Sequence, residues 1–391
     1  MAARLGFLFV SLLVLVKGQA LLAPEEAREL NHAIDAGLRG DRLGCNIQPE
    51  PVSLSFSFRF EAGYTVTCPV RVFDGKEGQV YSFVRVTPEN GESVVLGERF
   101  GIPAIPPDPS GDFKKVRAEI EFSGAFAIGE GQYSVEVIVA DHRKRLVRKQ
   151  WRIHASRHRS EQSVQIAMEP ASVAPLLTQP WDGGVERPGT GRRVTIIVDA
   201  APINPRALKL HAWDRALLLD CVSSLLAHTD FRSVRLIAIN LDQQREIFRE
   251  DNLDRKGWSD LGHRLRDLEL GTVSYKVVED QQGWSNLLIR LLRQEAASRE
   301  PSDAVIFVGP TSRITSRLPA ELLPKEGKGE FFYIEYYPAW LNGGEFPDAL
   351  AHITRALGGE VLKIHSPGEL AQAIQKIQKR LAPQDTGPAP H

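Results

Sequence analysis

Cysteine is scarce in this chain, with three residues in 391. A small exported domain stapled by disulfides carries far more, so a cysteine framework is excluded as the basis of folding. Cys45 and Cys68 fall in the same N-terminal block and could pair, which the sequence leaves open. Cys221 lies among apolar neighbours in "LLLDCVSSLL" with no thiolate-stabilising base beside it, which favours a buried thiol over a nucleophile.

An excess of charge of either sign is also missing. Lys and Arg number 48 against 49 Asp and Glu, so the formal net charge is −1 at pH 7. Composition therefore gives no support for nucleic acid as a partner. The basic stretch "HRKRLVRKQWRIHASRHR" at 142–159 has the residues of an anion-binding surface, but it also fits a solvated last strand leading into a polar linker, and we favour the second interpretation.

Beyond its N-terminus the chain lacks an apolar run of the roughly 20 residues that a membrane-spanning helix needs. The first residues, "MAARLGFLFVSLLVLVKGQA", combine an arginine, an apolar core and small residues at Gly18 and Ala20. This is the layout of a secretory signal peptide with cleavage after Ala20. We therefore expect an exported protein that does not span a membrane, with the periplasm and the extracellular space as alternative compartments.

The pattern of apolar residues changes along the chain. Residues 41–155 hold seven short segments that alternate apolar and polar residues between Gly, Pro, Asn or Asp, which predicts an all-β, immunoglobulin-like sandwich. After residue 191, near-continuous apolar runs such as "VTIIV" and "AVIFVG" alternate with segments of helical period. This predicts an α/β, Rossmann-like domain with a mostly parallel sheet, in which "RSVRLIAINLDQQREIFRED" supplies one antiparallel edge strand.

The segments between these blocks lack sustained periodicity and are rich in proline, which is typical of linkers and disordered tails. The predicted organisation in chain order is a signal peptide at 1–20, a short helical segment at 24–40, a β-sandwich at 41–155, a Pro-rich linker at 156–190, an α/β domain at 191–382 and a disordered tail at 383–391.

An apolar strand that stops at Asp199, in "RRVTIIVDAAPI", raises the question of a metal site. A strand ending in aspartate, then a long helix, then a strand with an antiparallel return edge resembles the opening of a von Willebrand factor A domain. In that family, Asp-x-Ser-x-Ser, a Gly-Gly-Thr-Asn-Leu-like loop and an Asp-Gly pair together bind one divalent cation. The resemblance covers about residues 192–382 and implies a von Willebrand A-like fold for them.

This chain departs from the family pattern at most ligand positions. Asp199 is kept, and Ser285 in "QGWSNLLIRLL" stands where the threonine would be. The other ligand positions carry residues without a suitable side-chain oxygen: Ala201, Ile203, Gly309 and Pro310. Magnesium needs most of its oxygen ligands in place. The resemblance therefore implies a degenerate metal-ion-dependent adhesion site and no cofactor, with a weak or partner-completed Mg²⁺ site as the alternative.

Asp199 and Ser285 also fit ordinary structural roles. Asp199 can accept backbone N–H bonds at the strand-to-helix turn, and Ser285 can cap its helix. Other sequence segments, including "CNIQPEPVSLSFSFRFEAGY" and "IHSPGELAQAI", resemble those of a family of secreted bacterial proteins with a von Willebrand A-related domain. That likeness spans both predicted domains and implies a fold and a compartment more than an activity.

Signals for catalysis are weak, because no histidine pair has metal spacing and no Gly-x-Ser-x-Gly elbow or phosphate loop follows a strand. Ligands of parallel α/β sheets bind at the loops beyond the carboxyl ends of the strands. Here those loops are rich in Ser, Thr, Arg and aromatic residues, so we predict a non-enzymatic protein that binds another protein or an envelope component. An accessory subunit that retains a divalent-metal site or a hydrolytic role is the alternative. The predicted binding residues are Trp340, Tyr337, Arg313, Arg317, Thr311 and Ser312.

Overall fold

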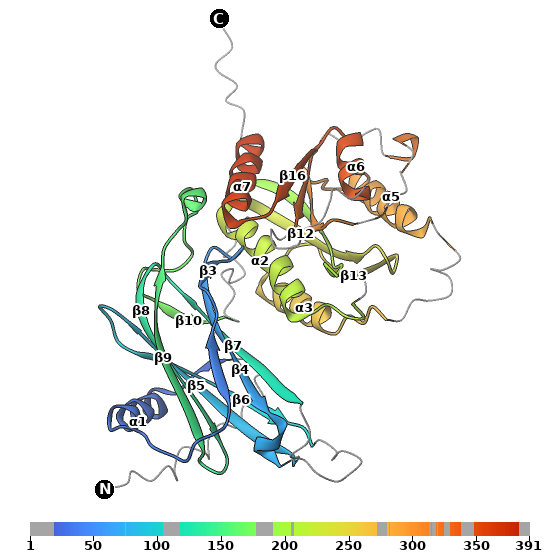
Figure 1. Ribbon diagram of the computed structural model, residues 1–391. Helices are drawn as coiled ribbons and strands as arrows, with labels where there is room; N and C mark the ends of the chain where they lie inside the picture. Colours follow the sequence, from blue (N-terminus) through green and yellow to red (C-terminus); the bar gives the residue numbers. More distant parts are fainter. Residues whose placement is uncertain are drawn as a thin grey trace, which may run out of the picture. The chain divides into compact units, whose positions relative to one another are not determined.

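The structure of the protein, a computed structural model, divides into two compact units (Figure 1). Unit 1 comprises Met1–Arg159 and Ile166–Thr178, and unit 2 comprises Ser160–Gln165 and Gln179–His391. The residues that the structure describes are 19–74, 76–104, 118–176, 191–204, 207–271, 280, 282–312, 314, 318, 320–323, 329–337 and 348–382.

Unit 1 contains two five-stranded antiparallel sheets, with strand orders β1-β6-β5-β8-β9 and β10-β7-β4-β2, and with β3 paired to β4. Helix α1 (Pro24–Asp35) packs on the first sheet, where its Leu30 and Ile34 contact Val95 and Ile138. The strands are β1 (Ala20–Leu21), β2 (Asn46–Pro49), β3 (Ser53–Leu54), β4 (Phe60–Pro69), β5 (Gly78–Pro88), β6 (Val94–Ile102), β7 (Glu119–Ile128), β8 (Gly131–Asp141), β9 (Leu146–Ala155) and β10 (Val173–Pro175).

A buried tyrosine links the two sheets of unit 1. The Tyr64 hydroxyl on β4 lies 2.6 Å from Ser82 Oγ on β5, and Gln19 Nε2 donates to Tyr64 at 2.8 Å. Burial raises the pKa of Tyr64, so its hydroxyl stays neutral and serves as donor and acceptor. Gly124 is required beside this ring, because a Cβ there would collide with the Tyr64 hydroxyl.

The cysteines divide between the two units. Cys45 and Cys68 form a disulfide that ties the segment before β2 to β4. Cys221 is buried and free in α2 of unit 2, where burial raises the pKa of its thiol. The interpretation of Cys221 as a small buried side chain is confirmed.

Unit 2 contains one six-stranded sheet with the order β13-β12-β11-β14-β15-β16. β12 and β13 pair antiparallel, and all the other neighbours pair parallel. The strands are β11 (Arg192–Asp199), β12 (Phe231–Asn240), β13 (Arg245–Glu250), β14 (Ala304–Pro310), β15 (Glu330–Tyr336) and β16 (Glu360–Ile364). The helices are α2 (Ala212–His228), α3 (Arg255–Arg266), α5 (Gly283–Ala296), α6 (Ala349–Ala356) and α7 (Pro367–Leu381).

The central strands of unit 2 are apolar because both of their faces are covered. β14 is buried at every position, and only the first two residues of β11 reach solvent. Leu288 of α5 and Ile353 of α6 join Ile197 and Phe307 of the sheet in one apolar cluster, so these two helices cover the same face. This arrangement leaves the carboxyl ends of the strands, rather than their faces, for polar groups.

The fold class predicted from the sequence, an immunoglobulin-like sandwich followed by a von Willebrand A-like domain, is wrong. Antiparallel pairing dominates the described residues, since two of the three sheets that they form are antiparallel throughout and the third is mixed. The described residues between 41 and 155 form eight strands, β2 to β9, where seven were predicted, and β1 and β10 lie outside that range. Apolar periodicity reports how deeply a strand is buried and not which strand pairs with which, and strands of two or three residues such as β1, β3 and β10 leave no periodic signal.

Part of the segment predicted as a linker, 156–190, is ordered. β10 pairs with Ile128, Ala127 and Phe126 of β7, and Val164 is buried. Residues 177–190, the predicted signal peptide up to residue 18 and the predicted tail 383–391 lie outside the described residues. In the part of the chain that the structure describes, no helix is both long enough and apolar enough to cross a membrane.

Candidate functional site

Three aligned positions form a row across the carboxyl ends of the central strands of unit 2. Asp199 ends β11, and the register of β11 on β14 brings it level with Gly309. Gly309 in turn pairs with Glu335 of β15, so both carboxylates lie on the same face of the sheet. A Cβ on Gly309 would lie 3.0 Å from the Asp199 Cβ, which shows that the glycine makes room for the aspartate.

Asp199 is buried, and among the described residues only one of its two carboxylate oxygens accepts a hydrogen bond. It is 1% exposed, and its Oδ1 accepts one hydrogen bond, from the backbone N–H of Leu241 at 3.3 Å. Its Oδ2 has no hydrogen-bond partner among the described residues. Burial, and then the charges of Asp242 and Asp348, raise the pKa of Asp199 well above its ordinary value of 3.8. A carboxylate in this state takes up a proton or a cationic partner more readily than an exposed one.

Glu335, two strands away on β15, is also a buried carboxylate with one bonded oxygen and one oxygen without a partner in the described residues. It is 6% exposed, its Oε1 accepts a hydrogen bond from Thr311 Oγ1 at 2.8 Å, and its Oε2 has no partner within the described part of the chain. Burial is the main cause that raises the pKa of Glu335, and the charge of Asp348 adds to it, while the Thr311 hydrogen bond acts in the opposite direction. The sheet edge therefore carries two buried carboxylates, each with a free oxygen.

Asp348 organises the loop beside these carboxylates. It accepts hydrogen bonds from Ser312 N at 2.8 Å, Ser312 Oγ at 3.1 Å and the Tyr333 hydroxyl at 3.1 Å. It is also the N-cap of α6, because its Oδ1 accepts from Ala351 N at 3.0 Å. One side chain thus joins β15, the loop after β14 and the start of α6.

Tyr333 donates a hydrogen bond to Asp348 and lies within the electrostatic influence of Glu335 and Asp199. Burial and the nearby charges of Asp348, Glu335 and Asp199 raise the pKa of its hydroxyl. The hydroxyl keeps its proton and shares it between Pro310 O at 2.9 Å and Asp348 Oδ2 at 3.1 Å. We call Asp199, Tyr333, Glu335 and Asp348 the acidic edge cluster.

Two of the predicted binding residues, Thr311 and Ser312, lie at this edge. Both are half-buried, and their hydroxyls are bonded to Glu335 and Asp348 respectively. They therefore hold the acidic edge cluster in place, and their side-chain hydrogen-bonding capacity is partly used within the chain.

Tyr337 also lies at the carboxyl end of its strand, directly after β15. Its ring is half-buried and edge-on to that of His365, with 6.3 Å between the ring centroids. His365 Nδ1 is 2.8 Å from Tyr337 O, which fixes the two residues together. The other predicted binding residues lie outside the described residues: Trp340, Arg313 and Arg317.

The structural roles predicted for the two remnant metal positions differ from those observed. Gln282, not Ser285, is the N-cap of α5, and Ser285 Oγ donates to Gln282 O at 2.6 Å. Within the described part of the chain, Asp199 accepts a hydrogen bond from Leu241, which follows β12, and none from its own strand-to-helix turn. The partner of Asp199 is set by tertiary packing, and the role of Ser285 by the exact residue at which α5 begins. Local sequence patterns place such a helix start only approximately.

The described residues do not fit a dedicated magnesium site. No three side chains of His, Cys, Asp or Glu in them lie close enough together to hold a metal ion. Magnesium requires near-octahedral oxygen ligation, and only one oxygen of Asp199 and one of Glu335 are free.

Sequence reasoning missed Glu335, Tyr333 and Asp348. Signals for two of them existed. Glu335 is the only charged residue inside "FFYIEYY", and an acid within a buried run requires an explanation. Asp348 directly precedes the helix-period segment "ALAHITRAL", which is the N-cap position.

Comparison with known proteins adds little. No family model and no curated protein matches the chain. Among solved structures, a glycosyl hydrolase family 2 member from Bacteroides cellulosilyticus has 11% identity and a TM-score of 0.19, covering 75% of this chain and 36% of its own. A Bacteroides uniformis beta-glucuronidase has 12% identity and a TM-score of 0.19, covering 81% and 38%. A structural-genomics target with 11% identity covers 30% of this chain and 97% of its own, also at 0.19.

These likenesses are too weak to show a fold, and this chain spans little more than a third of the length of the two glycosidases.

We expect Asp199→Asn to raise the free energy of unfolding at pH 7 by about 1 to 2 kcal/mol, because it removes a buried charge that lacks a second hydrogen bond. The folded-state pKa is raised, so the stability associated with this group is fully present below 3.8 and is lost as pH rises above that value. Denaturant titrations at pH 4 and pH 7 should show the gain of the variant only at the higher pH. A lower stability of the variant at pH 7, or a magnesium-dependent rise in Tm seen only in the wild type, would instead indicate a bound cation.

Proposed function

We propose that this protein is an exported, non-enzymatic binding protein that engages another protein or an envelope component through the acidic edge cluster and the loops around it. The observation that carries the proposal is that Asp199 and Glu335 each keep one buried carboxylate oxygen without a partner in the described residues. Buried polar atoms are almost always paired in native structures, and exceptions call for an explanation. A ligand that approaches the end of the sheet would supply the missing partner.

The chemistry of the cluster selects the kind of group that binds there. Carboxylates are acceptors when ionised, and the Tyr333 proton and the Thr311 hydroxyl are already engaged within the chain. The complementary group is therefore a hydrogen-bond donor, and a lysine or arginine side chain of a partner protein offers both donors and the opposite charge.

Export is supported by the disulfide between Cys45 and Cys68, since such bonds persist in oxidising compartments. The structure also bears on where a signal peptide would be cut. A cut after Ala20 would remove Gln19, which is buried and bonded to Tyr64, together with one of the two residues of β1. A cut directly before Gln19 would leave both features intact.

The same free oxygens favour one second candidate, an accessory subunit whose metal site is completed by its partner. Asp199 and Glu335 belong to strands separated by β14, and the described residues supply no third ligand. The partner would have to provide the remaining oxygens. Metal analysis of the isolated complex, with and without the partner, separates the two candidates.

A photo-crosslinking amino acid in place of Tyr337 should form an adduct with one envelope protein in intact cells, identified by mass spectrometry. The control is the same substitution at Tyr81, which is half-buried in unit 1. Adding Glu335→Gln to the first variant should reduce the adduct yield several-fold, because a charge-assisted hydrogen bond is lost. No adduct at position 337, or equal adducts at both positions, would contradict the proposal.

A further inference from the structure

Strand β13 is an outer strand of the six-stranded sheet in unit 2. Among the described residues it pairs with β12 alone. Arg245 is exposed, and the other five residues of the strand are partly exposed. An edge strand presents a row of backbone N–H and C=O groups that can pair with another chain unless a protective feature prevents it.

The sequence of β13 is "REIFRE". When a second copy of this strand runs antiparallel to it, each charged residue faces a residue of opposite charge. About a two-fold axis between Ile247 and Phe248, Arg245 faces Glu250 of the second copy. Glu246 then faces Arg249 of the second copy, and the two apolar residues face each other. Opposite charges directly across neighbouring strands stabilise pairing, and a two-fold axis doubles each contact.

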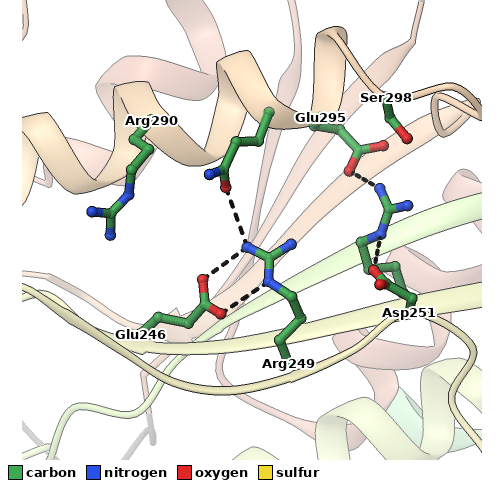
Figure 2. Close-up of a pocket in the computed structure, with 8 residues that line it drawn as sticks. Glu246, Arg249, Asp251, Arg290, Glu295 and Ser298 are labelled. Carbon is green, nitrogen blue, oxygen red and sulfur yellow. Dashed lines mark hydrogen bonds and ion pairs between the residues drawn. The ribbon is translucent and has the colours of Figure 1, made fainter.

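The side chains also lie on the faces that this pairing requires. The register on β12 places Glu246 opposite Ile239 and Arg249 opposite Ile237, and both isoleucines belong to the cluster under α5. Residues that face each other in an antiparallel pair must share a face of the sheet, and Glu246 and Arg249 do. Figure 2 shows them side by side below α5.

Within one chain, Arg249 Nε and Nη2 donate to the two Glu246 oxygens at 2.9 and 2.8 Å. Both side chains are still about 30% exposed, at 30% and 29%. A cavity of about 620 Å³ opens beside them, and its lining on the α5 side includes Gln294. Arg290 and Ser298 line the same side (Figure 2). The pair is therefore reachable by the side chains of a second copy.

A bulge in β13 specifies which strand can pair with it. Phe248 is opposite Ala238 and Glu246 is opposite Ile239, so Ile247 is the extra residue. A bulge opposes pairing with a regular strand. The two-fold axis places the bulged pair of one copy opposite the same pair of the other, so the irregularity is matched and the charged positions on either side stay aligned.

We propose that two copies of this chain associate by antiparallel pairing of β13 with β13, forming one sheet that runs through both. This inference does not depend on the function proposed for the acidic edge cluster, which lies at the strand ends. Sedimentation equilibrium of the full chain should show a concentration-dependent dimer. Arg249→Glu and Glu246→Arg should each raise the dimer Kd on the order of tenfold or more, because two attractive pairs become repulsive.

Mixing the two variants is the decisive measurement. One chain then carries Glu at both positions and the other carries Arg at both, so an equimolar mixture should restore a heterodimer. Stabilisation within a single chain could not produce that result. Arg380→Glu, the same change of charge on α7, should leave the dimer unchanged and serves as the control. A monomeric wild type, single variants that still dimerise like the wild type, or a mixture of folded variants that stays monomeric would each overturn the proposal.

Discussion

Replacing Asp348 with alanine should lower the free energy of unfolding by about 3 kcal/mol, since it removes a helix N-cap and takes the acceptor away from partly buried donors of Ser312 and Ala351. The side chain accepts four hydrogen bonds, two from Ser312 and one each from Tyr333 and Ala351. Loss of the cap should also loosen the first turn of α6. Urea titration followed by circular dichroism measures the first effect, and amide exchange of peptides from α6 measures the second.

Asp348→Asn is the matched control for this substitution. It keeps an oxygen that can accept the Ala351 cap and removes the negative charge that raises the pKa values of Asp199 and Glu335. Its cost should be about 1 kcal/mol or less, because relief of repulsion offsets a weaker hydrogen bond to Ser312. Equal losses for the two variants would show that charge, rather than the hydrogen-bond network, determines the contribution of this residue.

Removal of the disulfide should have an effect of similar size in unit 1. Cys45→Ala combined with Cys68→Ala opens a loop with a sequence separation of 23 residues, and a closed loop of this length stabilises a protein by about 3 kcal/mol. Reduction of the wild type with dithiothreitol should reproduce the loss.

Cys221→Ala provides the control for the disulfide variant. It removes the free buried thiol of unit 2 and leaves the disulfide intact, so added reductant should lower its stability as it does for the wild type. A wild type whose unfolding does not respond to reductant would show that Cys45 and Cys68 are not joined in the isolated protein.

The acidic edge cluster illustrates what a local pattern can and cannot reveal. Asp199 attracts attention because an apolar run stops there, and that much is visible in "VTIIVDA". The alignment of Asp199 with Glu335 on one face of the sheet depends on two registers, that of β11 on β14 and that of β14 on β15. A shift of one residue in either register would turn one carboxylate to the opposite face. Gly309 gains its role only from this alignment, since its missing Cβ makes room for Asp199.

The amino-acid sequence by itself determined where many strands and helices lie and how deeply they are buried. "AVIFVG" has no polar side chain and is buried throughout in β14, while "PGELAQAIQKIQKRL" has helical period and forms α7 behind the cap of Ser366. These properties follow from the spacing of apolar residues along the chain and from local hydrogen bonds.

Only the tertiary structure decided which strands are neighbours, and with them the fold class, the disulfide and the acidic edge cluster. Pairing depends on contacts between residues that are distant in sequence, such as Val198 of β11 and Val308 of β14, which pair across 110 positions (308 minus 198). Apolar periodicity does not identify such contacts, because a strand shows the same alternation of apolar and polar residues whichever strand it pairs with. The burial of Asp199 and Glu335, and the raised pKa of each, arise from that packing and not from the residues beside them in the chain.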